Sequence, residues 1–276
     1  MKLKNKNAKM DNLLQCIAEI EHVEESSFEP LFHIGKSVLE SSSPNLFDRV
    51  KKAVFEDIGF AYAKTGRGFP AFLRSKQGDC LDFSLLFYFS FRHSGMHTEM
   101  LAVPNHTIIR FFERDKGQIV ETTDGSLETA EFYILSRKIH PQSIVSHVYL
   151  SPLQDNQILA IYANNKARNT IQNRDYAFAL DMLNLAYGYC TTIPEVCYNL
   201  GYVYKQTGRL ENAKNFFSQA IKLHPNFSKA YNALGVCYAL ERDSKSAEVC
   251  FLKSLSIFRS SEAEANILRL KHERGR

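Results

Sequence analysis

A repetition with a period of 34 residues constrains the fold of this chain more than any other feature of its sequence. Residues 194–227 and 228–261 share matching pairs at this spacing: Leu200 and Leu234, Gly201 and Gly235, Tyr204 and Tyr238, Ala213 and Ala247, and Phe217 and Phe251. A less regular copy over residues 160–193 carries Ala179, Leu183 and Ala186 at corresponding positions. Such a period predicts a stack of similar units, each of which buries its apolar face against the next.

The residue types within the period predict two antiparallel helices in each repeat. Small residues fall where helix backbones cross, and large aromatic residues fill the spaces between repeats. Gly208 is expected in the turn between two helices, and Pro225 is expected to end the second. Residues 262–272 read as a capping helix. The spacing and residue types together resemble the tetratricopeptide repeat family.

This resemblance implies that the concave face of the stack binds a peptide or a helix of a partner protein. One binding mode in the family uses Lys and Asn side chains to clamp a C-terminal carboxylate. Asn199 and Lys229 match two of the five clamp positions, whereas Asn164, Arg168 and Ala233 occupy the others and do not match. Asn164, Arg168, Asn199 and Lys229 are taken as candidate partner-binding residues, and the alternative for Asn199 and Lys229 is that they are ordinary solvated polar positions.

The N-terminal half contains a cysteine at the start of a predicted buried helix. The segment from Cys80 to Arg92 is apolar on nearly all sides, and Gly95 follows as a C-terminal stop. Asp79 is a suitable N-cap, so Cys80 falls in the first turn, where unpaired backbone N–H groups and the helix dipole favour a thiolate. The alternative is a cysteine that only packs in the core.

Three strand-like runs follow this helix, at residues 98–103, 106–112 and 118–123. His106 begins the second run and Glu121 lies in the third, and the two-residue alternation of strands can direct both side chains to one place. A cysteine at a helix N-terminus with a histidine and a carboxylate from adjacent strands is the arrangement that nucleophilic thiol chemistry needs. Gln77 is a candidate oxyanion donor beside the Cys80 backbone N–H, or else a solvated loop amide.

The same residues carry a second family resemblance. This part of the chain resembles the transglutaminase-like superfamily, which shares the papain-type cysteine fold. The resemblance is carried by the pattern G-D-C-L-D-F-S, then S-G-M, H-T-I-I-R and V-E-T-T-D-G. More narrowly, it looks like the bacterial SirB-type proteins, which join such a domain to tetratricopeptide repeats. The resemblance implies that Cys80 is the nucleophile, His106 the base and Glu121 the orienting acid, where the superfamily usually has Asp. Asp124 is the alternative acid.

Together these features predict an α+β fold class in which a transglutaminase-like, papain-type cysteine domain precedes an all-α tetratricopeptide repeat stack. The expected boundaries are a helical lead-in over residues 1–40, the α+β domain over residues 41–150, and the repeats with their capping helix over residues 160–276. Helices are also expected over residues 11–23 and 44–55.

Composition and charge exclude several other classes. The formal charge of +4 is dispersed, so no nucleic acid is expected as a partner. The apolar stretch at residues 85–91 is far shorter than the roughly 20 residues of a membrane span. The basic N-terminus is not followed by an apolar segment, which predicts a cytoplasmic protein without a cleavable signal and leaves secretion without a signal open. The cysteines form no C-x-x-C pair, so neither a zinc knuckle nor a thioredoxin-type motif is present. No metal and no cofactor are expected.

The sequence is compatible with two functions. One is a cysteine-dependent enzyme on amide or acyl bonds, either a protease, amidase or deamidase or an acyl-transferring transglutaminase, with substrates delivered by the repeats. Hydrolysis and acyl transfer are not distinguished, because water or an amine can resolve the same thioester. The other function is a non-catalytic adaptor that retains the fold without the chemistry.

Overall fold

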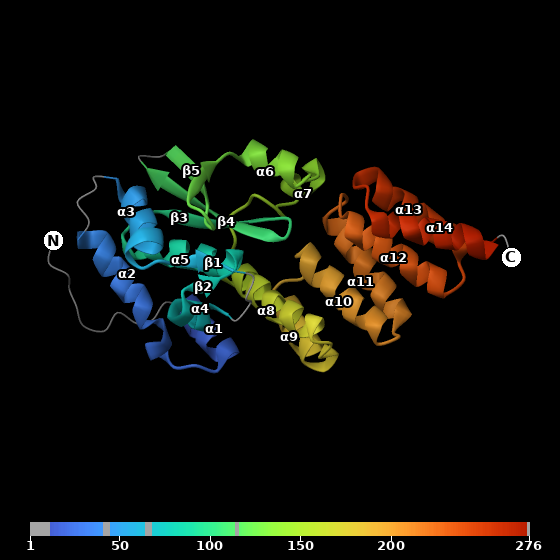
Figure 1. Cartoon of the computed structure of the whole chain (residues 1–276), viewed down its shortest axis with the longest axis horizontal. Coiled ribbons are helices and arrows are strands. Elements are labelled where there is room, and N and C mark those ends of the chain that lie inside the picture. Colours follow the sequence, from blue (N-terminus) through green and yellow to red (C-terminus); the bar gives the residue numbers. More distant parts are fainter. Residues whose placement is uncertain (1–11, 41–44, 64–67, 114–115, 275–276) are drawn as a thin grey trace. The chain divides into compact units, whose positions relative to one another are not determined.

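A computed structural model describes residues 12–40, 45–63, 68–113 and 116–274. The chain divides into two compact units. The first unit comprises residues 1–100 and 107–128, and the second comprises residues 101–106 and 129–276 (Figure 1).

The described helices of the first unit are α1 (Asn12–Glu21), α2 (Glu29–Glu40, after a 3-10 turn at Glu25–Phe28), α3 (Leu46–Lys52), α4 (Phe69–Ser75) and α5 (Cys80–His93). The two predicted N-terminal helices are confirmed as α1 and α3, which end at Glu21 and Lys52, before the predicted ends, while residues 11 and 44 of the predicted ranges lie outside the described residues. The α3 helix starts after Asn45, whose side chain accepts hydrogen bonds from the N–H groups of Phe47 and Asp48. At its other end a single π-helical turn, Ala53–Asp57, replaces the predicted continuation.

The strands form two sheets. A two-stranded parallel sheet joins β1 (Ala61–Tyr62) to β2 (Gln77–Gly78), and a four-stranded sheet has the order β3 (Thr98–Val103), β4 (His106–Glu113), β5 (Lys116–Glu121) and β6 (Ser126–Glu128). The three strands predicted from sequence are thus confirmed as β3, β4 and β5. Val120 of β5 lies opposite Ile109 of β4 on one side and opposite Leu127 of β6 on the other. The β6 strand was not predicted.

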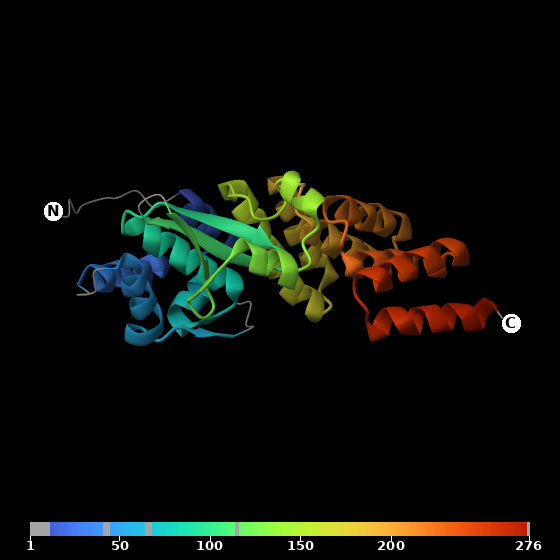
Figure 2. The same cartoon turned by 90° about the horizontal axis from the view of Figure 1, so that it is seen from above.

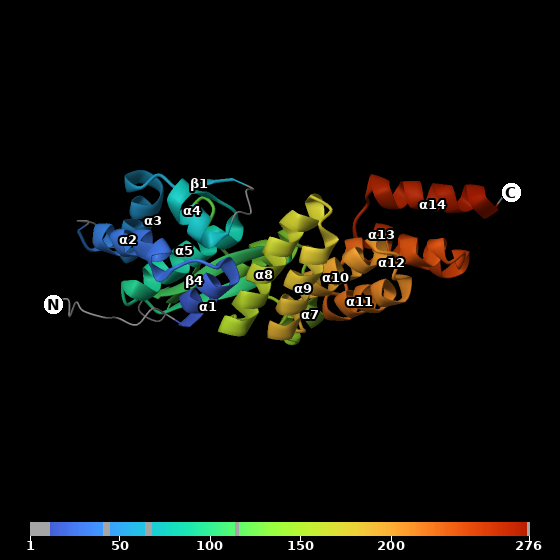
Figure 3. The same cartoon turned by 90° about the horizontal axis from the view of Figure 1, so that it is seen from below.

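The α5 helix is the centre of the first unit. Every side chain from Leu81 to Phe91 is buried, as its continuous apolar sequence predicts. Rings from neighbouring elements pack around it: Phe55 stacks on Phe83 with ring centroids 5.7 Å apart, and Phe91 stacks on Phe111 of β4 at 5.2 Å. Helices α2, α3 and α4 are grouped beside α5 (Figures 1 and 3).

The second unit begins with α6 (Ala130–Ser136) and α7 (Pro141–Val145), which the sequence patterns did not predict. Its described part continues with the hairpins α8–α9 (Asp155–Gln172 and Tyr176–Tyr189), α10–α11 (Pro194–Gln206 and Leu210–Leu223) and α12–α13 (Ser228–Leu240 and Ser244–Ile257), followed by α14 (Ser261–Arg274). These are the predicted repeats and their capping helix (Figure 2). The turns within the hairpins carry a left-handed residue every 34 positions, at Arg174, Gly208 and Arg242.

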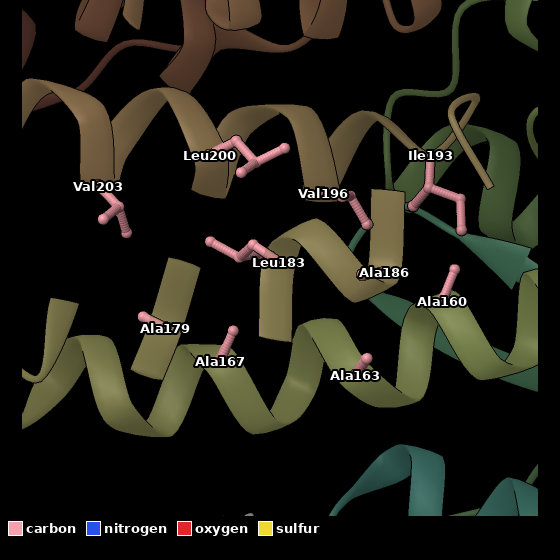
Figure 4. Packing of buried hydrophobic residues seen from close by; sticks show 10 residues of the cluster. All are labelled: Ala160, Ala163, Ala167, Ala179, Leu183, Ala186, Ile193, Val196, Leu200 and Val203. Atoms are coloured by element: carbon pink, nitrogen blue, oxygen red, sulfur yellow. The ribbon is translucent and has the colours of Figure 1, made fainter. Parts of the chain in front are cut away.

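Small side chains let the helices of the stack approach closely. Figure 4 shows the core between α8, α9 and α10, in which alanines line the helix crossings around larger residues such as Leu183 and Leu200. Gly201 of α10 faces Phe217 of α11 so closely that a Cβ atom there would lie 2.8 Å from the ring. Gly235 and Phe251 repeat this contact one period later, with 2.6 Å. Close packing against an aromatic ring therefore explains why glycine occupies this position in both repeats.

Candidate functional site

Cys80 is the first residue of α5, and a capping box fixes the start of that helix. The Asp79 side chain accepts hydrogen bonds from the N–H groups of Leu81 at 2.9 Å and Asp82 at 3.3 Å, while the Asp82 side chain accepts from the Asp79 N–H at 3.0 Å. The predicted N-cap is therefore confirmed. Cys80 is half-buried in the first turn, where the positive end of the helix dipole favours negative charge.

The carboxyl of Asp82 is buried beneath this turn. Burial, with a smaller contribution from the charge of Asp79, raises the pKa of Asp82 to about 8. At neutral pH this carboxyl is mostly protonated, so it adds little negative charge to the turn that holds Cys80. Gly78 completes the tight start of the helix, because a Cβ atom at this position would clash with the Phe72 ring and with Asp82.

The buried Ser84 hydroxyl connects α5 to Thr107 of β4 and to Thr122 in the turn after β5. Ser84 Oγ donates to the Thr107 carbonyl oxygen at 2.9 Å and accepts from Thr107 Oγ1 at 3.0 Å. Thr122 Oγ1 lies 3.0 Å from Ser84 Oγ, and all three side chains are at most 3% exposed. Thr107 Oγ1 is also 3.5 Å from the Cys80 carbonyl oxygen. Sequence reasoning missed this cluster, although a serine one helical turn after Cys80 in an apolar run was a signal for it.

The predicted base and the first predicted acid lie at the ends of strands, and the alternative acid lies in the turn after β5. His106 is the first residue of β4 and is half-buried. Glu121 ends β5, and its carboxylate accepts from the N–H and the hydroxyl of Thr123, at 3.2 and 2.8 Å. The exposed Asp124 accepts from the Ser126 N–H at 2.8 Å, so each candidate acid caps the turn that follows β5. Gln77 lies exposed in β2. The catalytic roles of these residues stay predictions.

The candidate partner-binding residues divide into two kinds. Asn164 of α8 and Asn199 of α10 are buried, and the Asn199 amide donates to the Asn164 side-chain oxygen at 2.8 Å. Arg168 and Lys229, in contrast, are exposed on α8 and α12. The two asparagines thus join consecutive repeats, whereas the two basic residues are accessible to another molecule.

Neither a metal centre nor a membrane-spanning helix is found among the residues that the structure describes. Over residues 12–40, 45–63, 68–113 and 116–274, His, Cys, Asp and Glu side chains nowhere gather in a group of three or more that could hold a metal ion. Within the same ranges, the helices are too short or too polar to cross a lipid bilayer.

Comparisons with known proteins match the repeats. Residues 194–227 and 216–249 match two family models, each described as "Tetratricopeptide repeat". A 58-residue stretch is 39% identical to the uncharacterized protein ycf37 of Pyropia yezoensis, and it covers 21% of this chain and 33% of that protein. The chain therefore matches about a third of the length of this relative.

Solved structures of two repeat domains are also similar. The first repeat domain of Spaghetti (RPAP3), bound to an HSP90 peptide, is 16% identical with a TM-score of 0.42 over 44% of this chain and 96% of that chain. The Sgt2 repeat domain from Aspergillus fumigatus is 20% identical with a TM-score of 0.40 over 41% and 78%. Residues 194–249 therefore match tetratricopeptide repeats, and the described hairpins α8–α9, α10–α11 and α12–α13 follow one another at the same 34-residue period.

Proposed function

We propose that the second unit binds a segment of another protein through the face made by the first helices of its repeats. The observation that carries this proposal is that these helices are consecutive neighbours: α10 contacts both α8 and α12, and α12 also contacts α14. Repeat stacks of this kind bind partners along such extended faces. Arg168 and Lys229 provide exposed positive charge on two of these helices, which favours a segment that carries a carboxylate.

Charge reversal at this face tests the proposal. Peptides that bind the full-length protein are selected from a random peptide library, and their affinities are measured for the wild type and for Arg168→Glu and Lys229→Glu. Each variant is expected to bind about tenfold more weakly, which corresponds to a loss of about 1.4 kcal/mol in binding free energy. Lys222→Glu, an exposed lysine on the second helix of its hairpin, is the matched control. Equal affinity of wild type and both variants for every selected peptide contradicts this assignment of the face.

A second candidate function is cysteine-dependent chemistry on amide or acyl bonds in the first unit. It is supported by Cys80 in the first turn of a capped helix, by the mostly neutral Asp82 beneath it, and by the transglutaminase-like sequence pattern. In this proposal the Cys80 thiolate attacks the carbonyl carbon and forms a thioester. His106 transfers the proton to the leaving amine, and Glu121 orients the imidazole. Bound partner segments are the substrates.

Alkylation by iodoacetamide, followed by peptide mass mapping from about pH 5 to about pH 8, tests the second candidate. Cys80 is expected to react faster than the similarly half-buried Cys16 and Cys190 at about pH 6. The buried thiols are internal controls, because burial raises the pKa of Cys197 to about 12 and of Cys237 to about 11. If Cys80 reacts no faster than a model thiol at about pH 6, the enzyme proposal fails and the adaptor function remains.

A further inference from the structure

The turn that precedes the candidate base belongs to the second unit, where three contacts hold it. Residues 101–106 include this turn, and Asn105 adopts the left-handed conformation there with φ of 58°. The Leu150 N–H donates to the Ala102 carbonyl oxygen at 2.9 Å, and Leu101 forms an isolated β-bridge with Pro152. The third contact comes from a side chain of the repeats.

That side chain is Glu195, the second residue of α10. Its Oε1 atom accepts a hydrogen bond from the Asn105 backbone N–H at 3.0 Å and another from the Tyr149 hydroxyl at 2.9 Å. A single carboxylate oxygen therefore joins the turn before His106, the segment that leads into the repeats and a repeat helix. The first turn of a helix also suits a negative side chain, because of the helix dipole.

The repeat itself does not require an acid at this position. The corresponding positions one period earlier and one period later are Ile161 and Lys229, so the stack accepts apolar and basic side chains there. The environment also disfavours the charge, because burial raises the pKa of Glu195, and its hydrogen bonds together with the positive charge of Arg168 only partly oppose that effect. The contacts to the turn and to Tyr149 therefore account for the glutamate better than the packing of the stack does.

We infer that Glu195 is a positioning residue for His106. By holding the Asn105 backbone it fixes the orientation of His106, so that a helix of the repeats positions the candidate catalytic base. This inference rests on the proposed cysteine chemistry. His106 directly follows Asn105, and a left-handed residue held by one hydrogen bond determines the direction in which the chain enters β4. Loss of that bond leaves the turn free to change and alters the orientation of the His106 side chain at the start of β4.

The experiment compares Glu195→Ala with Glu195→Gln and Tyr149→Phe in the full chain. Glutamine keeps a carbonyl oxygen that can accept both hydrogen bonds, whereas alanine keeps neither. Glu195→Ala is expected to lower the rate of Cys80 alkylation at about pH 6 by about tenfold and to shift its pH profile. Glu195→Gln is expected to restore the wild-type profile. Tyr149→Phe retains the Asn105 bond and should leave the profile unchanged. Glu211→Ala, an exposed acid in the first turn of α11, is the matched control.

A second measurement separates failure of this inference from failure of the proposed chemistry. The NMR chemical shifts of the His106 ring and the hydrogen exchange of the Asn105 amide report on the turn without any reaction. Changes at both sites in Glu195→Ala but not in Glu195→Gln support positioning even if wild-type Cys80 proves unreactive. If Glu195→Ala folds with wild-type His106 shifts, Asn105 exchange and alkylation profile, the inference is overturned.

Discussion

The side chain of Asn199 donates a hydrogen bond from Nδ2 to Oδ1 of Asn164, 2.8 Å away, and so joins α10 to α8 inside the repeat stack. The two residues are only 9% and 4% exposed. A buried amide that loses its partner incurs the cost of an unsatisfied polar group, about 1–3 kcal/mol. This pair therefore links consecutive repeats, and a role of either side chain in binding a partner stays a prediction.

Removal of one member of the pair is expected to destabilise the protein. Asn199→Ala should lower the free energy of unfolding by about 1–3 kcal/mol, because Asn164 is left without this donor. The double variant with Asn164→Ala should cost less than the sum of the single changes. Urea unfolding followed by circular dichroism measures both effects, with the exposed Asn215→Ala as control. Single variants as stable as the wild type would contradict this prediction.

Gly201→Ala is expected to destabilise the repeats through overpacking. The added Cβ atom would lie 2.8 Å from the Phe217 ring and 3.1 Å from the Ala213 carbonyl oxygen, which requires α10 and α11 to separate. Such overpacking lowers the free energy of unfolding by about 1–3 kcal/mol. Gly188→Ala in α9 is the matched control, because nothing lies within 4 Å of its added Cβ atom, and it should be neutral or stabilising by up to about 1 kcal/mol. Thermal unfolding of both variants distinguishes the two sites.

His224 is expected to make the stability of the protein depend on pH. Burial lowers the pKa of His224 to about 4, with a smaller contribution from His140, and its ring contacts Tyr149 edge-on at 5.2 Å. Between about pH 4 and the ordinary histidine pKa of about 6.5, the folded chain binds fewer protons than the unfolded chain. The stability is therefore fully present above about pH 6.5 and falls as the pH drops, by at most about 3 kcal/mol.

Replacement of this histidine should flatten that pH dependence. His224→Phe keeps an aromatic ring against Tyr149 but cannot bind a proton, so its free energy of unfolding should fall less than that of the wild type between about pH 7 and about pH 4.5. His272→Phe, at an exposed position on α14, should retain the wild-type slope. Parallel slopes for His224→Phe and the wild type would show that this ring does not titrate as described.

Replacement by alanine should destabilise the protein at Ser84 of α5 but not at Ser90 of the same helix. Ser84→Ala removes the hydroxyl that bonds Thr107 and Thr122, and it should cost about 1–3 kcal/mol. Ser90 Oγ is also buried but has no hydrogen-bond partner among the described residues, so Ser90→Ala should be neutral or stabilising. Chemical unfolding at neutral pH compares them. Equal losses at both positions would contradict the proposed importance of the hydroxyl cluster.

The sequence predicted the elements of both units well where the signal is local. The 34-residue period located the hairpins, and the apolar run after Asp79 located α5 together with its N-cap. The sequence predicted less where contacts with residues distant in the chain decide the local structure. The short β6 strand pairs with β5 through only three residue pairs, and α6 and α7 are too brief for a clear periodicity. The strand positions of His106 and Glu121 were predicted correctly, but their joint role with Cys80 stays a prediction.

The sequence by itself determined the repeat, the buried helix and the position of Cys80 in its first turn, because side-chain periodicity and capping act over a few residues. Only the tertiary structure decided that Asn164 and Asn199 bond to each other and that Glu195 holds the Asn105 turn. These contacts join residues 35 and 90 positions apart, and no local pattern specifies which distant backbone group a polar side chain will meet.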